Sequence, residues 1–126
     1  MPMILWVAAG GALGSAARYL VNVAAGRLLG PEFPWGTLTV NIAGSFVMGL
    51  MIALMALKMQ VSQEVRAFLT TGILGGFTTF SAFSLDFAVL VERREAGLAA
   101  LYVIASVALS LAAIFAGLKL GRALLS

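Results

Sequence analysis

Few polar side chains in this sequence could do chemistry, and several of them lie inside long apolar stretches. Asn41 occurs within GTLTVNIAGSF, residues 36–46. A carboxamide supplies two donors and one acceptor, so it can replace part of the water around a small anion. It can equally well make a hydrogen bond that joins two helices. The residue type and its depth favour neither interpretation over the other.

Three hydroxyl-bearing residues, Tyr102, Ser106 and Ser110, follow one another at intervals of four in the last apolar run. On an α-helix this spacing puts the three hydroxyls on one face, along about 12 Å of the helix axis. A lone serine in a membrane helix usually donates to the carbonyl four residues before it. Three hydroxyls in one row modestly favour a polar pathway.

Phe80 and Phe83 lie three residues apart, beside a cluster of glycines and threonines. On spacing alone, such phenylalanines usually belong to a core or face lipid. The alternative uses the ring edge, which carries a partial positive charge and can meet a small anion. Because no basic side chain lies near the centre of the apolar runs, a path lined by uncharged donors and ring edges favours a small anion over a cation.

The stretch GILGGFTTFSAF, residues 72–83, is unlike an ordinary membrane helix. Each glycine weakens a helix by about 1 kcal/mol relative to alanine, and the hydroxyls of Thr78 and Thr79 compete for backbone groups. A break near the middle of the third helix is therefore predicted. Non-helical backbone persists at membrane depth only where it is buried in protein or lines a wet cavity, so we expect this stretch to face a path or a bound ion.

Two charged residues lie near these elements: Arg18 follows the first glycine-rich stretch, and Asp86 lies in the far part of the third apolar run. Asp86 can line a vestibule, pair with Arg18 or mark the membrane boundary. The sequence leaves these three interpretations open.

The composition indicates an integral membrane protein, because 62% of the 126 residues are hydrophobic and only 10% are charged. The sequence has no cysteine and no histidine, which excludes disulfides and thiol redox chemistry and argues against a zinc site or a catalytic triad. An enzyme is not expected, since candidate catalytic residues are lacking. The net charge of +3 is small and spread out, which gives no support to nucleic-acid binding.

Four apolar runs are long enough to cross a bilayer, which takes about 20 residues. These runs are residues 3–25, 35–57, 65–91 and 98–120. We therefore predict a single all-α membrane domain over residues 1–126, with four transmembrane helices. The third run would span about 40 Å as a helix, against a hydrocarbon core of about 30 Å, which fits an interruption at its middle.

Local signals indicate how these helices begin and pack. Ser62, before Gln63 and Glu64, is the predicted N-cap of the third helix. Small residues four apart predict close contacts between helices. They occur in the first and last helices, as Gly10 with Gly14 and Gly117 with Gly121.

Basic residues are balanced between the two sides of the membrane if the helices alternate in direction. One side has Lys58, Arg66, Lys119 and Arg122, and the other has Arg18, Arg27, Arg93 and Arg94. Without a positive-inside bias the chain has no strong reason to prefer one orientation, although balanced counts also arise by chance. Four short helices make too thin a bundle to enclose a pore, which together with the balance favours an antiparallel homodimer inserted both ways up.

Three segments in order resemble the Fluc (CrcB-type) fluoride channels over essentially the whole chain. They are GGALGSAARY (10–19), GTLTVNIAGSFVMG (36–49) and GILGGFTTFSAFSLD (72–86). The resemblance implies a multi-pass protein of a prokaryotic plasma (inner) membrane, forming a dual-topology antiparallel homodimer in the lipid bilayer. It further implies two pores that passively and selectively conduct fluoride out of the cytoplasm and relieve fluoride toxicity.

The resemblance also implies roles for individual residues. The pore residues would be Asn41, Phe80, Phe83, Tyr102, Ser106 and Ser110. A structural sodium ion on the dimer axis would bind the backbone carbonyls of Gly75 and Thr78, with no organic cofactor. Arg18 matches the basic residue that ends the first motif, near a vestibule, where Asp86 is the other candidate. One departure is Ala82, where many relatives have threonine.

Two other functions remain as alternatives. A small proton-coupled exporter would need a titratable carboxylate deep in the membrane, whereas the acidic residues all lie at or near the ends of the apolar runs. These residues are Glu32, Glu64, Asp86, Glu92 and Glu95. A non-transporting scaffold or accessory subunit would show no ion flux when purified.

Overall fold

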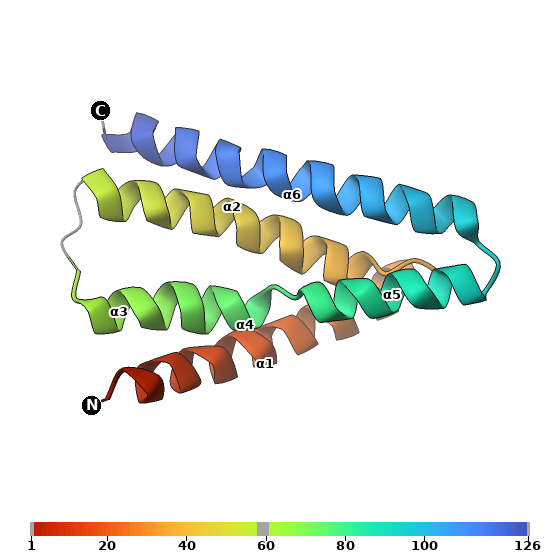
Figure 1. Ribbon diagram of the computed structural model, residues 1–126, viewed down its shortest axis with the longest axis horizontal. Helices are drawn as coiled ribbons and strands as arrows, with labels where there is room; N and C mark the ends of the chain where they lie inside the picture. The colour runs from red at the N-terminus through yellow and green to blue at the C-terminus, as the bar shows by residue number, and fades with distance from the viewer. Residues whose placement is uncertain (1, 58–60, 126) are drawn as a thin grey trace.

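The chain folds into helices alone over the part that the structure, a computed structural model, describes, which is residues 2–57 and 61–125 (Figure 1). Lys58, one of the basic residues counted above, lies outside these residues. So does the start of the predicted connection between the second and third helices. The elements are α1 (Met3–Leu29), α2 (Trp35–Leu57), α3 (Gln63–Ala67), the π-helical segment η1 (Phe68–Leu74), α4 (Gly75–Phe77), α5 (Phe80–Glu92) and α6 (Ala96–Leu125).

Four helical spans are long and apolar enough to cross a membrane, which confirms the prediction of four such helices. They are Met3–Leu29, Trp35–Ala56, Gln63–Glu92 and Ala96–Leu124. The third of these spans contains α3, η1, α4 and α5 in sequence. The chain is therefore a multi-pass membrane protein built from helices.

Three helical spans extend beyond the predicted bounds, and the third does so only slightly, as Gln63–Glu92 against residues 65–91. The first was expected to end at residue 25, but α1 continues through Gly26 and ends at Leu29. Gly30 follows with φ of 85°, and its N–H donates to Gly26 O at 3.1 Å, so Gly30 supplies the left-handed residue that ends the helix. One interior glycine costs only about 1 kcal/mol, which explains why Gly26 does not stop α1.

The last helix also differs, because α6 runs from Ala96 to Leu125 where residues 98–120 were expected. The prediction used the apolar run, whose end marks a membrane boundary rather than a helix end. Arg122 lies in the last turn of α6, where a cation interacts favourably with the helix dipole. The predicted N-cap of the third helix is confirmed, since Val65 N donates to Ser62 Oγ at 3.2 Å.

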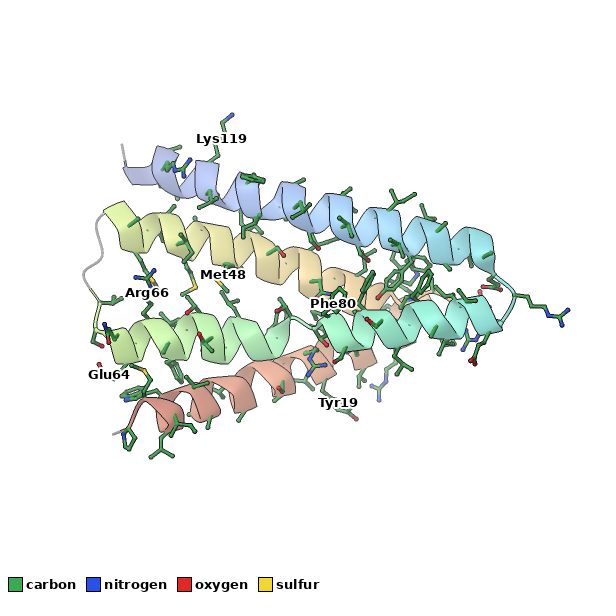
Figure 2. The ribbon with its side chains drawn as sticks, viewed as in Figure 1. Tyr19, Met48, Glu64, Arg66, Phe80 and Lys119 are labelled. Carbon is green, nitrogen blue, oxygen red and sulfur yellow. The ribbon has the colours of Figure 1, made fainter. Side chains whose placement is uncertain are left out.

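The helices lie in two pairs along one common direction (Figure 1). α6 packs along α2, and α1 packs along η1 and α4. The starts of α1 and α3 and the end of α6 lie at one end of the molecule, and the α1–α2 and α5–α6 connections lie at the other (Figure 1). Arg66 and Lys119 both lie in the half with the termini (Figure 2), as alternating helices require.

Glycines allow the backbones in each pair to approach closely, as the small residues four apart predicted. A Cβ atom at Gly10 would lie 2.5 Å from Phe68 O and 2.9 Å from Gly72 Cα. A Cβ at Gly117 would lie 2.8 Å from Leu50 N. The α1–η1 and α2–α6 contacts therefore depend on the absence of side chains at these positions.

We predict that Gly10→Ala lowers the unfolding midpoint of the purified protein, because its methyl group must push η1 away from α1. Overpacking of this kind costs about 1 to 3 kcal/mol. The matched control is Gly11→Ala, since a Cβ at Gly11 has no atom within 4 Å; it should leave the midpoint unchanged or raise it. Equal thermal midpoints for the two variants in detergent would contradict this account of the packing.

Candidate functional site

The helical backbone of the third span stops for two residues between α4 and α5. Thr78 (φ −87°, ψ 158°) and Thr79 (φ −157°, ψ 126°) are extended. Leu74 O accepts from both the amide and the hydroxyl of Thr78, at 3.0 and 2.9 Å. Thr79 Oγ1 accepts from Ala82 N at 3.1 Å and so caps α5. The two threonines thus end one helix and begin the next.

Side chains from α1 and α2 satisfy main-chain groups at this interruption. Arg18 Nε donates to Gly76 O at 3.1 Å. Asn41 makes two hydrogen bonds to one residue: its Nδ2 donates to Thr79 O at 3.0 Å, and its Oδ1 accepts from Thr79 N at 2.8 Å. Asn41 therefore joins two helical spans, and one of its two N–H groups remains for another partner.

Three main-chain carbonyls at the interruption have no hydrogen-bond donor. Gly75 O, Phe77 O and Thr78 O accept no hydrogen bond from another residue within the described ranges. In a continuous helix each would accept from the amide four residues later. They are consequently available as oxygen ligands.

A cavity of about 310 Å³ lies between α2, the interruption, α5 and α6. Its polar lining comes from α2, the interruption and α6, and its aromatic lining comes from α5. The lining residues are Asn41, Ser45, Thr78, Thr79, Phe80, Phe83, Ser106, Val107, Ser110 and Leu111. The structure thus brings together five of the six predicted pore residues in one place.

The serine hydroxyls on this wall are available to a ligand. Ser106 is only 6% exposed, and its buried Oγ has no hydrogen-bond partner among the described residues. Hydroxyls elsewhere in the third span donate to their own helix, as Ser84 does to Phe80 O at 3.0 Å and Thr70 does to Arg66 O at 2.7 Å. A buried hydroxyl without a partner is costly, so the position of Ser106 indicates that something else can meet it in this cavity.

The two phenylalanines at the start of α5 lie against each other, with ring centroids 5.5 Å apart at 45°. Phe80 is 78% exposed in the single chain. Phe83 lies deeper, with its ring 5.1 Å from that of Tyr102. Both rings border the cavity, but one of them leaves most of its surface uncovered by this chain.

Tyr102 differs from the other predicted pore residues, because it does not line this cavity. It is fully buried, and its Oη donates to Asp86 Oδ2 at 3.1 Å. Its ring contacts those of Phe33 and Phe83, at 5.5 and 5.1 Å. Tyr102 thus connects the α5 aromatic pair to Asp86 rather than continuing the row formed by Ser106 and Ser110.

Asp86 and Arg18, the two predicted vestibule residues, lie at different places. Asp86 lines a second cavity of about 410 Å³ next to the α1–α2 connection, together with Glu32 and Arg93. Arg18 contacts Gly76 at the interruption. The hydrogen-bond partner of Asp86 is Tyr102 rather than Arg18.

One residue of the site was not selected from the sequence, and another, Thr79, was linked only to the break in the helix. Ser45 lines the cavity, and its position four residues after Asn41 could have revealed that both share one face of α2. Thr79 contributes its main chain to Asn41 and its hydroxyl to the cap of α5. Its position as the last residue before an apolar helical stretch was the available signal.

Comparison with known proteins assigns the chain to a family. The family model described as "CrcB-like protein, Camphor Resistance (CrcB)" matches residues 5–118. The chain belongs to this CrcB family. The resemblance deduced from the three sequence motifs is therefore confirmed.

Proteins named fluoride-specific ion channel FluC are similar to this CrcB-family chain over nearly its whole length. The relative from Agrobacterium fabrum is 60% identical over 119 residues, covering 94% of this chain and 95% of the relative. Those from Rhodospirillum centenum and Rhizobium etli are 58% and 56% identical, over 97% and 98% of this chain and 97% and 99% of the relatives. These relatives are named as channels and not as enzymes.

The Tyr102–Asp86 contact gives a testable stability prediction. Tyr102→Phe keeps the ring but removes the hydrogen bond, and we expect it to lower the free energy of unfolding by about 1 kcal/mol. A double-mutant cycle with Asp86→Ala should give a coupling energy of similar size. Tyr19→Phe is the control, because Tyr19 is 67% exposed and points away from the other helices (Figure 2). Strictly additive effects of the two substitutions would show that the hydrogen bond contributes nothing.

Proposed function

We propose that this chain is a passive, selective fluoride channel that exports fluoride from the cytoplasm across the plasma (inner) membrane of a prokaryote and so relieves fluoride toxicity. The observation that carries the proposal is the cavity in which the unpartnered Ser106 hydroxyl and the Asn41 carboxamide face Phe80 and Phe83. The names of the full-length relatives support fluoride as the ion.

The chemistry of the cavity suits a small, strongly hydrated anion. Such an ion leaves water only where donors replace its hydration shell. Ser106 and Ser110 offer hydroxyl donors from α6, and the remaining N–H of Asn41 offers one from α2. The ring edges of Phe80 and Phe83 add a weak positive potential without a basic charge that would trap the ion.

The functional unit of the proposal is an antiparallel homodimer with two pores. Phe80 leaves 78% of its surface uncovered, so its ring needs a second surface before a narrow path can form. A second copy inserted the opposite way up would supply that surface and place the same cavity in each half. The absence of a charge bias between the two sides supports insertion in both orientations.

A structural sodium ion on the dimer axis is the proposed cofactor, and the residues present fit it. The free carbonyls of Gly75 and Thr78 are hard oxygen ligands of the kind that a sodium ion binds. Two copies of each would supply four oxygens. When bound, the ion would supply positive charge that holds the two interrupted helices together.

Fluoride efflux from liposomes that contain the purified protein tests the proposal. We expect rapid fluoride release, little chloride release under the same gradient, and no dependence on a proton gradient. A requirement for a proton gradient would favour an exporter instead. No release of fluoride from a folded dimer would reject the channel and favour a scaffold role.

The ring-edge role predicts that Phe80→Ile sharply reduces fluoride flux while the dimer still forms, because isoleucine keeps an apolar surface but has no ring quadrupole. Phe83→Ile should reduce fluoride flux in the same way. Phe115→Ile is the matched control: Phe115 is a similarly exposed phenylalanine, at 67%, on α6, and its substitution should leave flux unchanged. Undiminished flux in both α5 variants would rule out this role.

Ser106→Ala should change stability and flux in opposite directions. It removes a buried hydroxyl without a partner, so the free energy of unfolding should rise by about 1 kcal/mol, whereas the lost donor should slow fluoride efflux about tenfold. Ser84→Ala is the control, because the Ser84 hydroxyl donates to its own helix. A Ser106→Ala protein that is less stable and equally conductive would contradict both expectations.

A further inference from the structure

We propose that Asn41 is a positioning residue for the cation site: it binds both main-chain groups of Thr79 and thereby leaves the carbonyl of Gly75 free. This inference rests on the proposed sodium site and deepens it. It gives Asn41 a role that is separate from contact with fluoride.

The hydrogen bonds at the interruption show how this works. In a continuous α-helix, Thr79 N would donate to Gly75 O, four residues earlier. Here Thr79 N donates to Asn41 Oδ1 at 2.8 Å, and Gly75 O accepts no hydrogen bond from another described residue. The side chain of Asn41 therefore takes the donor that a regular helix would give to the Gly75 carbonyl.

The other half of the contact holds Thr79 from its carbonyl side. Thr79 is the N-cap of α5, and its carbonyl oxygen accepts from Asn41 Nδ2 at 3.0 Å. Because unsatisfied main-chain groups are costly at membrane depth, Thr79 has two alternatives. It pairs with Asn41, or it returns to the helical pattern and occupies Gly75 O.

The helix that carries Asn41 lies close enough for this contact because of Gly44. A Cβ atom at Gly44 would meet the Thr78 side chain and would lie 3.3 Å from the ring of Phe77. Gly44 follows Asn41 by three residues and so lies near it on α2. The close approach of α2 to the interruption is thus built into the same helical turn as Asn41.

Two consequences separate this role from that of a simple pore donor. Loss of the Asn41 side chain should let Thr79 N return to Gly75 O, which removes a cation ligand as well as a pore donor. Ser45, one turn further along α2, lines the same cavity but makes no hydrogen bond to the interruption. Ser45→Ala is therefore the matched control, because it changes the cavity wall without releasing Thr79.

Carbonyl NMR can observe Gly75 directly, because the sequence has only two Gly-Gly pairs, Gly10-Gly11 and Gly75-Gly76. In a protein labelled with 1-¹³C,¹⁵N-glycine, only the carbonyls of Gly10 and Gly75 are bonded to a labelled glycine nitrogen. The Gly10 carbonyl lies within α1 and is an internal reference for a hydrogen-bonded helical carbonyl. Hydrogen bonding moves a carbonyl carbon signal downfield.

In sodium-free full-length protein we expect the Gly75 signal upfield of the hydrogen-bonded reference, and added sodium should shift Gly75 but not Gly10. Ser45→Ala should behave like the unmodified protein. In Asn41→Ala the Gly75 signal should move downfield, and the sodium concentration needed for half of the shift should rise at least tenfold.

Three results would overturn the inference: a Gly75 carbonyl that is hydrogen-bonded in the unmodified sodium-free protein, a Gly75 signal that never responds to sodium, or an Asn41→Ala protein with the same sodium response as Ser45→Ala. The first two need no variant, so they decide the matter even if Asn41→Ala fails to fold. Fluoride efflux from liposomes that contain the unmodified protein tests the proposed channel function separately. A conducting protein with an unresponsive Gly75 would keep the channel and reject this role of Asn41.

Discussion

An interrupted helix inside a membrane needs a partner for each main-chain group that it exposes, and the rest of this structure follows from that constraint. Thr78 and Thr79 leave the helical pattern, where lipid offers no hydrogen bonds. Asn41 from α2 and Arg18 from α1 supply partners at the two sides of the interruption. The groups that remain unpaired border the cavity or lie at the interruption, which is why the candidate ligands gather there.

These side chains reach the interruption only because the helices approach closely. The α1–η1 contact depends on Gly10, whose Cβ would meet main-chain atoms of η1, and the α2 contact depends on Gly44. Longer side chains at these positions would move Arg18 and Asn41 away from their partners. The glycines therefore contribute to the site indirectly, through distance, although they line neither its polar nor its aromatic wall.

The sequence predicted the features that depend on local patterns and missed those that depend on competition between neighbours. The four helices, the Ser62 cap and the close glycine contacts follow from hydrophobicity and residue type, and the structure has them. The end of α1 at Leu29 instead of residue 25 depends on which of two glycines adopts a positive φ. The π-helical η1 and the pairing of Tyr102 with Asp86 depend on packing across the bundle, which periodicity along one helix does not contain.

The two interpretations of Asn41 that the sequence left open turn out to be compatible. A carboxamide has more hydrogen-bonding groups than a contact with one residue uses, so Asn41 can bind both main-chain groups of Thr79 and still keep one N–H for another partner. Ser106 is the opposite case, since its buried hydroxyl has no hydrogen-bond partner in the part of the chain that the structure describes. Such a hydroxyl lowers the stability of the fold unless a ligand meets it. In the proposed channel, Asn41 would offer a donor that its contact with Thr79 holds in place, and Ser106 would offer a donor that is not already paired. A path for a small anion without a basic side chain needs donors of both kinds.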